Sequence, residues 1–217
     1  MDNDVPGRRR SDLLTRRRRE TEWEIAEAAL ELFERQGVAH TTVEQIAERA
    51  GVSPRTFFRY SPSKEGAVML YQGGIDEEVF AALEPERAGD DPIRALEEGF
   101  VRAVAELDNE ATAKARRVLR VRQLAAAEPS VAQAMMHADT ERNERTVAKL
   151  AAALGTSPDS LEPRAIVAVL DATMQIMFED WVRRAEAGEH PKVSELYARA
   201  RKLIAAAAQY GDRRALS

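Results

Sequence analysis

Apolar side chains recur at helical spacing near the start of the chain. The positions are Trp23, Ala26, Leu30 and Phe33. Steps of three and four residues place such side chains on one face of an α-helix. Gly37 follows this run, and glycine suits the left-handed residue with which many helices end. The pattern predicts a helix that begins near Thr21 and ends at Gly37.

A second, shorter apolar stripe predicts a second helix. It consists of Val43, Ile46, Ala47 and Ala50. Two pairs, Thr41 with Glu44 and Thr42 with Gln45, have the spacing of a capping box, in which each side chain bonds the backbone N–H of the other residue. The helix is therefore expected to begin at Thr41 or Thr42 and to end at Gly51.

Cap and proline signals predict two more helix starts. Ser53 is a good N-cap, and Pro54 fits the first helical turn, where no N–H is needed. A third helix is expected to run from Pro54 to about Tyr60. Residues 61–63, Ser-Pro-Ser, repeat the signal and predict the start of a fourth helix.

The rest of the chain alternates helical patterns with short breaks. The breaks fall at residues 85–92, near 108, at 128–129, at 155–163 and at 188–191. They delimit segments of roughly 15–25 residues, which is typical of an antiparallel bundle. The predicted fold is all-α, with an N-terminal three-helix helix-turn-helix head and a C-terminal antiparallel helical bundle domain.

Charges are segregated along the chain. The net charge is −5, but residues 8–19 hold seven arginines and a single acid, and residues 49–64 hold four basic residues and no acid. A locally positive surface on an acidic body suits a nucleic-acid partner. The arginine run either follows the DNA minor groove or phosphates, or is only a solubilising tail. The sequence leaves both interpretations open.

The third predicted helix carries side chains suited to DNA. Phe57 is expected on its inner face, where it holds the helix against its neighbours. Arg55 can bind a guanine edge or a phosphate with both arms of its guanidinium, and Tyr60 can donate its hydroxyl to a phosphate. Two short helices around a glycine turn are the layout that places the second one in the major groove. The predicted DNA-contacting residues are Thr42, Ser53, Pro54, Arg55, Thr56, Phe58, Arg59, Tyr60 and Lys64. The alternative is that the arginines only form a solvated surface.

Residues 22–65 resemble the N-terminal DNA-binding domain of the TetR family of bacterial transcriptional regulators. The matching pieces are Ala28–Phe33 with Gly37, Thr41–Val43, Ile46–Ala47, Ala50–Ser53, Thr56–Tyr60 and Pro62–Glu65. Two positions depart from the family pattern. Phe58 stands where the family often has a tyrosine, so it lacks the hydroxyl that would bind a phosphate. Ser61 stands where the family usually has an apolar aromatic residue.

The resemblance implies a homodimer that binds a palindromic DNA operator and releases it when a small ligand enters the C-terminal domain. We therefore expect a flexible Arg-rich arm at residues 1–19, a helix-turn-helix DNA-binding domain at 20–65, and a ligand-binding and dimerisation domain at 66–217. The fourth helix is expected to connect the two domains and to transmit the motion.

Two segments near the C-terminus are candidates for the dimer interface. The apolar stripe of residues 165–184 is too wide for a helix that covers only one side of a core, and residues 193–209 add a second apolar face with an alanine tract. In the TetR family two such helices usually pair with their symmetry mates in a four-helix interface. The alternative is a helix buried within one monomer.

Soft apolar side chains in the C-terminal part suggest a pocket for an apolar or acyl-type effector. The candidate lining residues are Leu119, Leu124, Met135, Met136, Met174, Met177, Phe178 and Trp181. The alternative is that they form ordinary core. A basic stretch either meets a charged group of the ligand at the pocket mouth or forms a solvated helix face. It consists of Lys114, Arg116, Arg117, Arg120 and Arg122.

Other function classes lack support in the sequence. No cysteine is present, and His40, His137 and His190 lack the spacing of metal ligands, so we expect no metal and no cofactor. No nucleophile motif indicates an enzyme. No apolar run approaches a membrane span, and the N-terminus lacks a secretory signal, so the expected location is cytoplasmic. The sequence predicts a DNA-binding repressor; the alternative is a helical ligand-binding or protein-interaction module without specific DNA binding.

Overall fold

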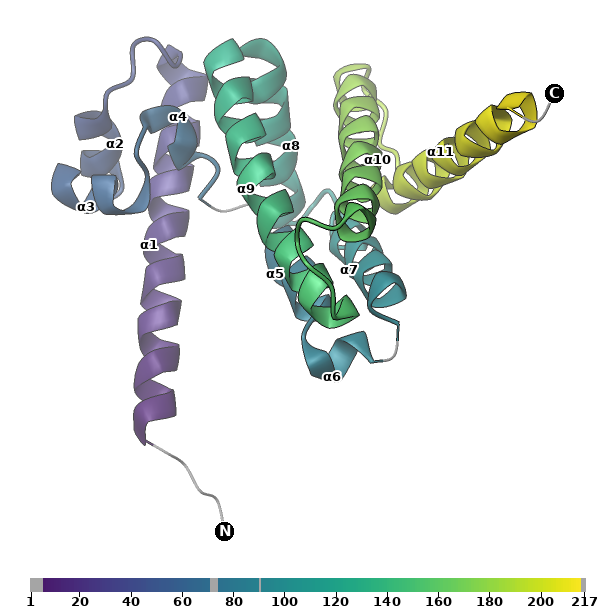
Figure 1. Cartoon of the computed structure of the whole chain (residues 1–217). Helices are drawn as coiled ribbons and strands as arrows, with labels where there is room; N and C mark the ends of the chain where they lie inside the picture. The colour runs from purple at the N-terminus through teal and green to yellow at the C-terminus, as the bar shows by residue number, and fades with distance from the viewer. Residues whose placement is uncertain (1–5, 71–73, 90, 216–217) are drawn as a thin grey trace. The chain divides into compact units, whose positions relative to one another are not determined.

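The computed structural model describes residues 6–70, 74–89 and 91–215, and side chains from Arg16 to Gln209 within these ranges except that of Glu86. The described residues form helices and no β-strand, as predicted (Figure 1). The first helices are α1 (Pro6–Gln36), α2 (Val43–Arg49), α3 (Pro54–Tyr60), α4 (Lys64–Ala67), α5 (Ile75–Ala82) and α6 (Pro85–Ala88). The later, mostly longer ones are α7 (Pro92–Ala105), α8 (Ala113–Ala127), α9 (Pro129–Leu154), α10 (Leu161–Glu186) and α11 (Val193–Ala215).

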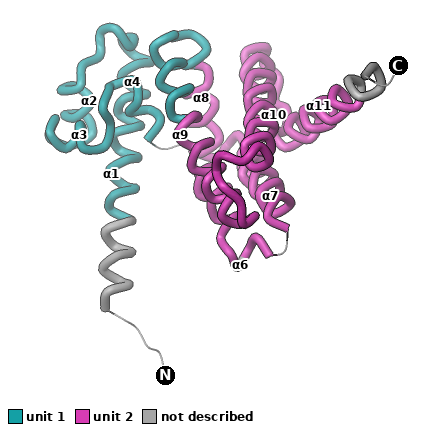
Figure 2. Tube along the Cα trace, in the orientation of Figure 1, with its two compact units in different colours: residues 1–72, 124–138 teal, residues 73–123, 139–217 magenta. Residues whose placement is uncertain are grey.

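The chain divides into two compact units (Figure 2). The first comprises residues 1–72 and 124–138, so the tip of the α8–α9 hairpin belongs with the N-terminal helices. The second comprises residues 73–123 and 139–217. Both helices of the hairpin therefore run from one unit into the other.

Helix α1 begins earlier than predicted. The sequence pattern begins near Thr21, whereas α1 begins at Pro6, so residues 6–19, which were expected as a flexible arm, are helical. Arginine is a good helix former, and a helix that is already nucleated by its packed part extends easily. Two ion pairs at i,i+4 spacing support this extension. They join Arg16 Nε to Glu20 Oε1 at 3.0 Å and Arg18 Nε to Glu22 Oε1 at 2.8 Å. Residues 1–5 of the expected arm lie outside the described residues.

The apolar face predicted for the first helix forms the core of the first unit. Helix α1 carries fully buried side chains and contacts α2 and α4. Helix α2 in turn contacts α3. The core residues on these helices include Ile25, Leu30, Phe33, Ile46 and Phe57. The packing of α2 on α1, and of α3 on α2, fixes the direction in which α3 faces solvent.

The fourth helix is much shorter than a connector between domains requires. Helix α4 spans only Lys64–Ala67, is capped by the Ser63 side chain and belongs wholly to the first unit. Residues 71–73, which follow it, lie outside the described part. The helices that the structure describes as running through both units are α8 and α9.

The second unit has one apolar core with contributions from all its long helices. Helices α5 and α7 pack closely, and Gly99 makes this possible, because a Cβ there would lie 2.7 Å from the Cβ of Ala82. Helix α10 packs on α11, and α11 also contacts α7. Each predicted break lies at or beside a helix boundary, but residues 85–92 also contain α6, and the break at 155–163 overlaps the first residues of α10. No described helix combines the length and apolar character that a bilayer span requires.

Candidate nucleic-acid interface

Side-chain caps fix the starts of α2 and α3. Thr42, rather than Thr41, is the N-cap of α2: its hydroxyl accepts from Gln45 N at 3.3 Å, and Gln45 Oε1 accepts from Thr42 N at 3.0 Å. The Thr41 side chain is buried and donates to Gly37 O at 2.9 Å. Ser53 caps α3 by accepting from Thr56 N at 3.0 Å, and Pro54 occupies the first turn, as predicted. These caps satisfy backbone donors that would otherwise lack partners at each helix start.

Gly51 makes the turn between the two helices. Its φ of +67° lies in the left-handed region, which side chains with a Cβ adopt only at a cost. The Val52 backbone N–H then bonds Ala47 O at 2.9 Å, which closes the end of α2 onto the turn. The angle between α2 and α3 therefore depends on a residue that tolerates positive φ.

Helix α3 has one buried face and one exposed face. Phe57 is fully buried, as predicted, whereas Phe58 is 56% exposed, and their rings meet edge to face with centroids 5.6 Å apart. Arg55 and Arg59 are exposed, and the Arg59 guanidinium lies 5.2 Å from the centroid of the Tyr60 ring. The exposed face thus presents two cations with an aromatic surface beside them. Ser53 and Pro54, at the start of α3, and Thr42, at the start of α2, are also exposed.

Lys64, predicted to contact DNA, is partly buried and binds backbone of the first unit. Its ammonium donates to Val38 O at 2.7 Å and to Thr41 O at 2.9 Å. Two of its three donors are therefore engaged by the loop between α1 and α2. Lys64 therefore fastens α4 to that loop.

Ser61, the departure from the family pattern, is accommodated without strain. It is buried at the C-terminal end of α3, where its hydroxyl donates to Ser63 O at 2.8 Å. A Cβ at Gly66 would lie 3.0 Å from this hydroxyl oxygen. A small residue at 61 thus fits a tight approach of α4 to the end of α3.

The predicted effector-lining residues are divided between the two units. Met174, Met177, Phe178 and Trp181 are buried on α10 in the core of the second unit, and Leu119 is partly buried against the same core. Leu124, Met135 and Met136 belong to the first unit. Sequence reasoning missed Tyr197 of α11, which is buried in the same cluster as Trp181. The signal for Tyr197 in the sequence was its position next to Leu196 in a segment with a predicted apolar helix face.

The basic stretch on α8 is not the solvated face that one interpretation expected. Arg117 is fully buried. The Arg122 guanidinium lies 4.0 Å from the centroid of the Phe178 ring, and Arg122 Nη1 lies 4.0 Å from Asp139 Oδ2. Among the arginines of this stretch, only Arg116 is exposed. Some of these basic side chains therefore lie in the interior of the second unit and do not form a solvated helix face.

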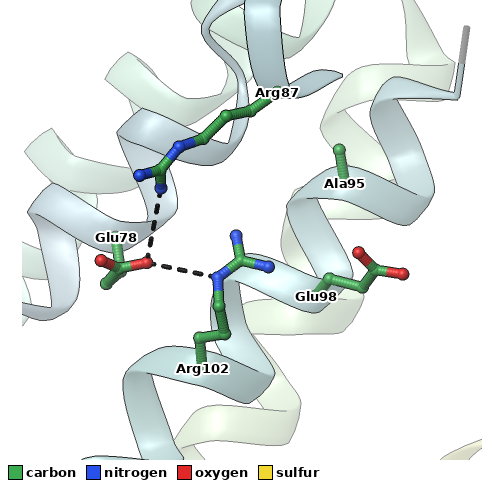
Figure 3. A pocket seen from close by; sticks show the side chains of 5 residues that line it. All are labelled: Glu78, Arg87, Ala95, Glu98 and Arg102. Carbon is green, nitrogen blue, oxygen red and sulfur yellow. Dashed lines mark hydrogen bonds and ion pairs between the residues drawn. The ribbon is translucent and has the colours of Figure 1, made fainter. Parts of the chain in front are cut away.

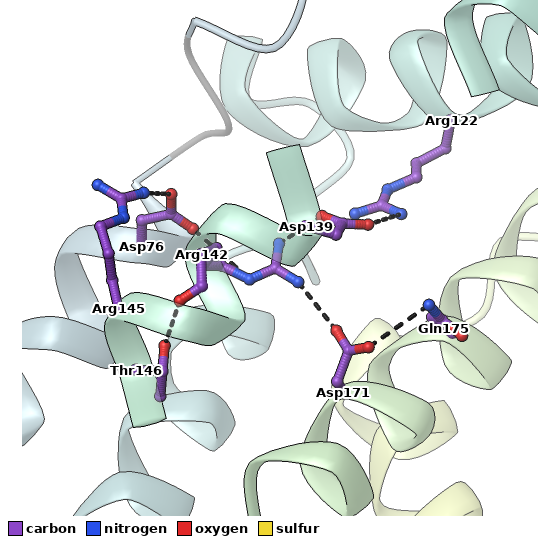
Figure 4. Close-up of polar contacts among 8 residues, drawn as sticks. All are labelled: Asp76, Arg122, Asp139, Arg142, Arg145, Thr146, Asp171 and Gln175. Atoms are coloured by element: carbon purple, nitrogen blue, oxygen red, sulfur yellow. Dashed lines mark hydrogen bonds and ion pairs between the residues drawn. The ribbon is translucent and has the colours of Figure 1, made fainter. Parts of the chain in front are cut away.

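Arg142 organises a buried polar network in the second unit (Figure 4). Its guanidinium donates to Asp139 Oδ1 at 2.6 Å and to Asp171 Oδ1 at 3.0 Å, and Asp76 lies 4.0 Å away. Burial raises the pKa of the Asp76 carboxyl, while Arg142 and then Arg145 act in the opposite direction. One side chain on α9 thus binds α10 and faces the start of α5.

Two cavities of the second unit are lined by residues other than the predicted ones. The smaller, of about 380 Å³, is polar, and its charges are paired: Glu78 Oε2 lies 3.3 Å from Arg102 Nε and 3.8 Å from Arg87 Nη1 (Figure 3). The larger, of about 630 Å³, is an open groove between α7 and α10 with Ile93, Ile166 and Val169 in its wall.

Comparison with known proteins identifies the family. Residues 25–67 match the family model described as bacterial regulatory proteins, tetR family. The chain is 37% identical over 181 residues to the HTH-type transcriptional regulator TcmR of Streptomyces glaucescens, and the match covers 80% of this chain and 78% of TcmR. The chain belongs to the TetR family. It is therefore a DNA-binding transcriptional regulator, and its relatives are regulators rather than enzymes.

Solved structures of TetR-family proteins share the fold. The SmeT–triclosan complex aligns with a TM-score of 0.53 at 20% identity over 86% of this chain and 90% of SmeT. SmeT itself, the repressor of the Stenotrophomonas maltophilia multidrug efflux pump SmeDEF, aligns with a TM-score of 0.52 at 20% identity over 87% of this chain and 91% of that one. Both confirm the predicted combination of a helix-turn-helix head and a helical C-terminal domain.

Proposed function

We propose that this TetR-family regulator is a dimeric repressor that binds a palindromic operator through α3 and leaves it when a small apolar or acyl-type molecule binds in the second unit. The exposed face of α3 carries the proposal. Arg55 and Arg59 face solvent there, while Phe57 anchors the helix from the other side. A short helix held in this way can enter a major groove without deforming the head.

Arg55 is the proposed base-reading residue, and its neighbours are proposed to fix the register. A guanidinium can bind the O6 and N7 atoms of a guanine together. Arg59, Thr42 and Tyr60 suit phosphate contacts, which orient the helix but carry little sequence information. Phe58 offers only apolar contact. Residues 16–19 stay candidates for a further phosphate contact, although two of these arginines pair with Glu20 and Glu22.

The dimer is proposed to form on α10 and α11. Several large apolar side chains on these helices are exposed, including Val169, Ile176 and Leu203, with exposed fractions of 50%, 49% and 60%. Apolar surface of this kind marks association sites. A twofold pair would present two copies of α3 to successive half-sites on one face of the DNA.

An alternative is a helical ligand-binding or protein-interaction module without specific DNA binding. The test is a binding titration of the full chain with DNA from upstream of its own gene, with unrelated DNA of equal length as competitor. We expect specific binding, and Arg55→Ala is expected to weaken it by about tenfold or more, as for a lost base-reading arginine. Arg87→Ala, which removes an exposed arginine of the second unit, is the matched control and should bind as the unaltered chain does.

Two results would overturn different parts of the proposal. Equal affinity for upstream and unrelated DNA would remove the operator from the proposal. Specific binding that Arg55→Ala leaves intact would keep the regulator but remove α3 as its reading element.

A further inference from the structure

Two buried hydrogen-bond donors in the second unit have no partner. Trp181 is fully buried and Tyr197 is 2% exposed, and neither the indole Nε1 nor the phenol oxygen forms a hydrogen bond. Both residues belong to the apolar core cluster. An unpaired buried donor of this kind costs about 1–3 kcal/mol of stability, which a phenylalanine at the same position would avoid.

Buried threonine hydroxyls of this unit are satisfied. The Thr146 hydroxyl donates to Arg142 O at 2.9 Å, and the Thr173 hydroxyl donates to Val169 O at 2.7 Å. Two carboxylate oxygens, on Asp76 and Glu110, also lack hydrogen bonds, but the second oxygen of each lies against a basic side chain. The Trp181 and Tyr197 donors have no such second atom, so each side chain is wholly unpaired.

The two residues lie at a similar level along neighbouring helices. Trp181 lies five residues before the end of α10, and Tyr197 lies four residues after the start of α11. At the rise of an α-helix, each residue is about 6–8 Å from the helix end that the connecting loop joins. Helices α10 and α11 pack on each other. The Phe178 ring lies 6.1 Å from the Trp181 ring, and Met174 and Met177 are buried in the same cluster.

We propose that the Trp181 indole N–H and the Tyr197 hydroxyl are the polar anchors of the effector site, and that the effector is a neutral apolar molecule whose carbonyl oxygen accepts from them. This rests on the proposed function in one respect, namely that the second unit binds an effector. It selects a neutral oxygen acceptor over the fatty carboxylate that an acyl-type ligand would offer.

The chemistry of the anchors supports a neutral acceptor. Both are uncharged donors, and burial raises the pKa of Tyr197, so the phenol keeps its proton. A carboxylate bound there would be buried against two neutral donors, which costs far more than burying a ketone. The Arg122 guanidinium near Phe178 already faces the Asp139 carboxylate.

The surroundings of the anchors allow an effector to enter. Trp181 and Tyr197 are enclosed, so a molecule reaches them only by displacing neighbouring side chains. Met174 and Met177 are unbranched and adapt readily to a new shape. Helix α10 also carries Asp171, which binds Arg142 of α9, and α9 begins within the first unit. A shift of α10 on binding therefore reaches a helix that belongs partly with the DNA-binding head.

A pair of probes that differ only in the carbonyl tests the anchors. Benzophenone has the acceptor, and diphenylmethane has the same two rings without it; dodecanoate represents the fatty carboxylate. Calorimetric titration of the full chain is expected to give about tenfold tighter binding of benzophenone than of diphenylmethane, the size of one or two net hydrogen bonds. Dodecanoate should bind more weakly than benzophenone. Irradiation of bound benzophenone should cross-link it to α10, at Met174 or Met177.

Variants that remove one donor separate an anchor from a structural residue. Tyr197→Phe and Trp181→Phe should each reduce the preference for benzophenone over diphenylmethane to about threefold or less. Tyr197→Phe should leave the thermal midpoint unchanged or raise it, because it removes an unpaired donor. Thr146→Val, which removes a paired hydroxyl, is the control: it should lower the midpoint and leave the probe preference intact.

Several results would overturn the inference. These are equal binding of the two ring probes, no binding of benzophenone, tighter binding of dodecanoate, cross-links confined to other helices, or a clear loss of stability in Tyr197→Phe. The DNA titration reports on the proposed function separately. If the chain binds its operator specifically but does not prefer the carbonyl probe, only the proposal about the anchors fails. If the chain prefers the carbonyl probe but does not bind DNA specifically, only the repressor proposal fails.

Discussion

Lys64 illustrates how one residue can fit two roles until its contacts are known. The sequence placed it among the DNA-contacting residues because it is a cation at a helix start. Its ammonium instead binds two backbone carbonyls of the α1–α2 loop. A charge-assisted hydrogen bond contributes more to stability than a neutral one, and loss of the donor would leave both carbonyls without this partner.

Lys64→Met is therefore expected to destabilise the head. It keeps the apolar stem and removes the donors, so the free energy of unfolding should fall by about 1–3 kcal/mol in chemical denaturation. Lys149→Met is the matched control, since Lys149 forms an exposed ion pair with Glu84 at 2.7 Å and should contribute at most about 1 kcal/mol. Unchanged stability together with weaker DNA binding would restore Lys64 to the DNA-contacting set.

At the scale of elements, the α2–α3 turn depends on one glycine. Gly51 and Gly155 share a φ of +67°, and a Cβ at either position would meet no atom within 4 Å. The cost of an alanine at either site is therefore conformational alone, about 1–2 kcal/mol. The two glycines differ only in what their turns join: α2 to α3 in one case, and α9 to α10 in the other.

Gly51→Ala and Gly155→Ala are expected to lower stability by similar amounts but to differ in DNA binding. Only Gly51→Ala alters the angle between α2 and α3, so it alone should weaken operator binding. The two variants are compared by thermal denaturation and by the DNA titration described above. Equal effects on DNA binding would mean that the turn does not set the direction of α3.

The Arg142 network joins three helices of the second unit through one side chain. Arg142→Leu would leave the buried Asp139 carboxylate and the partly buried Asp171 carboxylate with only weaker contacts, from Arg122 at 4.0 Å and Gln175 at 3.4 Å, so we expect the free energy of unfolding to fall by about 2–4 kcal/mol. Arg87→Leu breaks an exposed pair with Glu78 and should cost less than about 1 kcal/mol. Similar losses in chemical denaturation would show that the network is not special.

At the scale of the whole molecule, association decides whether two α3 helices act together. The exposed apolar side chains of α10 and α11 are the proposed interface. Leu203→Glu places a charge in it and is expected to give a monomer in sedimentation velocity, with weaker binding to a full operator because one head covers one half-site. Met136→Glu changes a residue that is 68% exposed in the first unit, and this variant should stay dimeric. A Leu203→Glu variant that stays dimeric would move the interface elsewhere.

Much of this fold was determined by local sequence signals. Ser53 and Pro54, Gly37 and Gly51 fixed helix ends because caps, proline and left-handed residues act within a few residues of the chain. The inward position of Phe57 followed from the helical repeat. The exposed face of α3 could therefore be predicted, whereas its contacts with DNA stay predictions.

Tertiary structure decided what local signals left open. Thr41 and Thr42 had equal capping patterns, and only the packing of the α1–α2 loop, which buries Thr41, left Thr42 as the cap. Periodicity also did not reveal that Arg117 and Arg142 are buried, because whether a charge can be buried depends on partners distant in sequence. The same holds for Trp181 and Tyr197. Their residue types and positions suggest apolar core, but only their three-dimensional surroundings show that their hydrogen-bond donors lack partners.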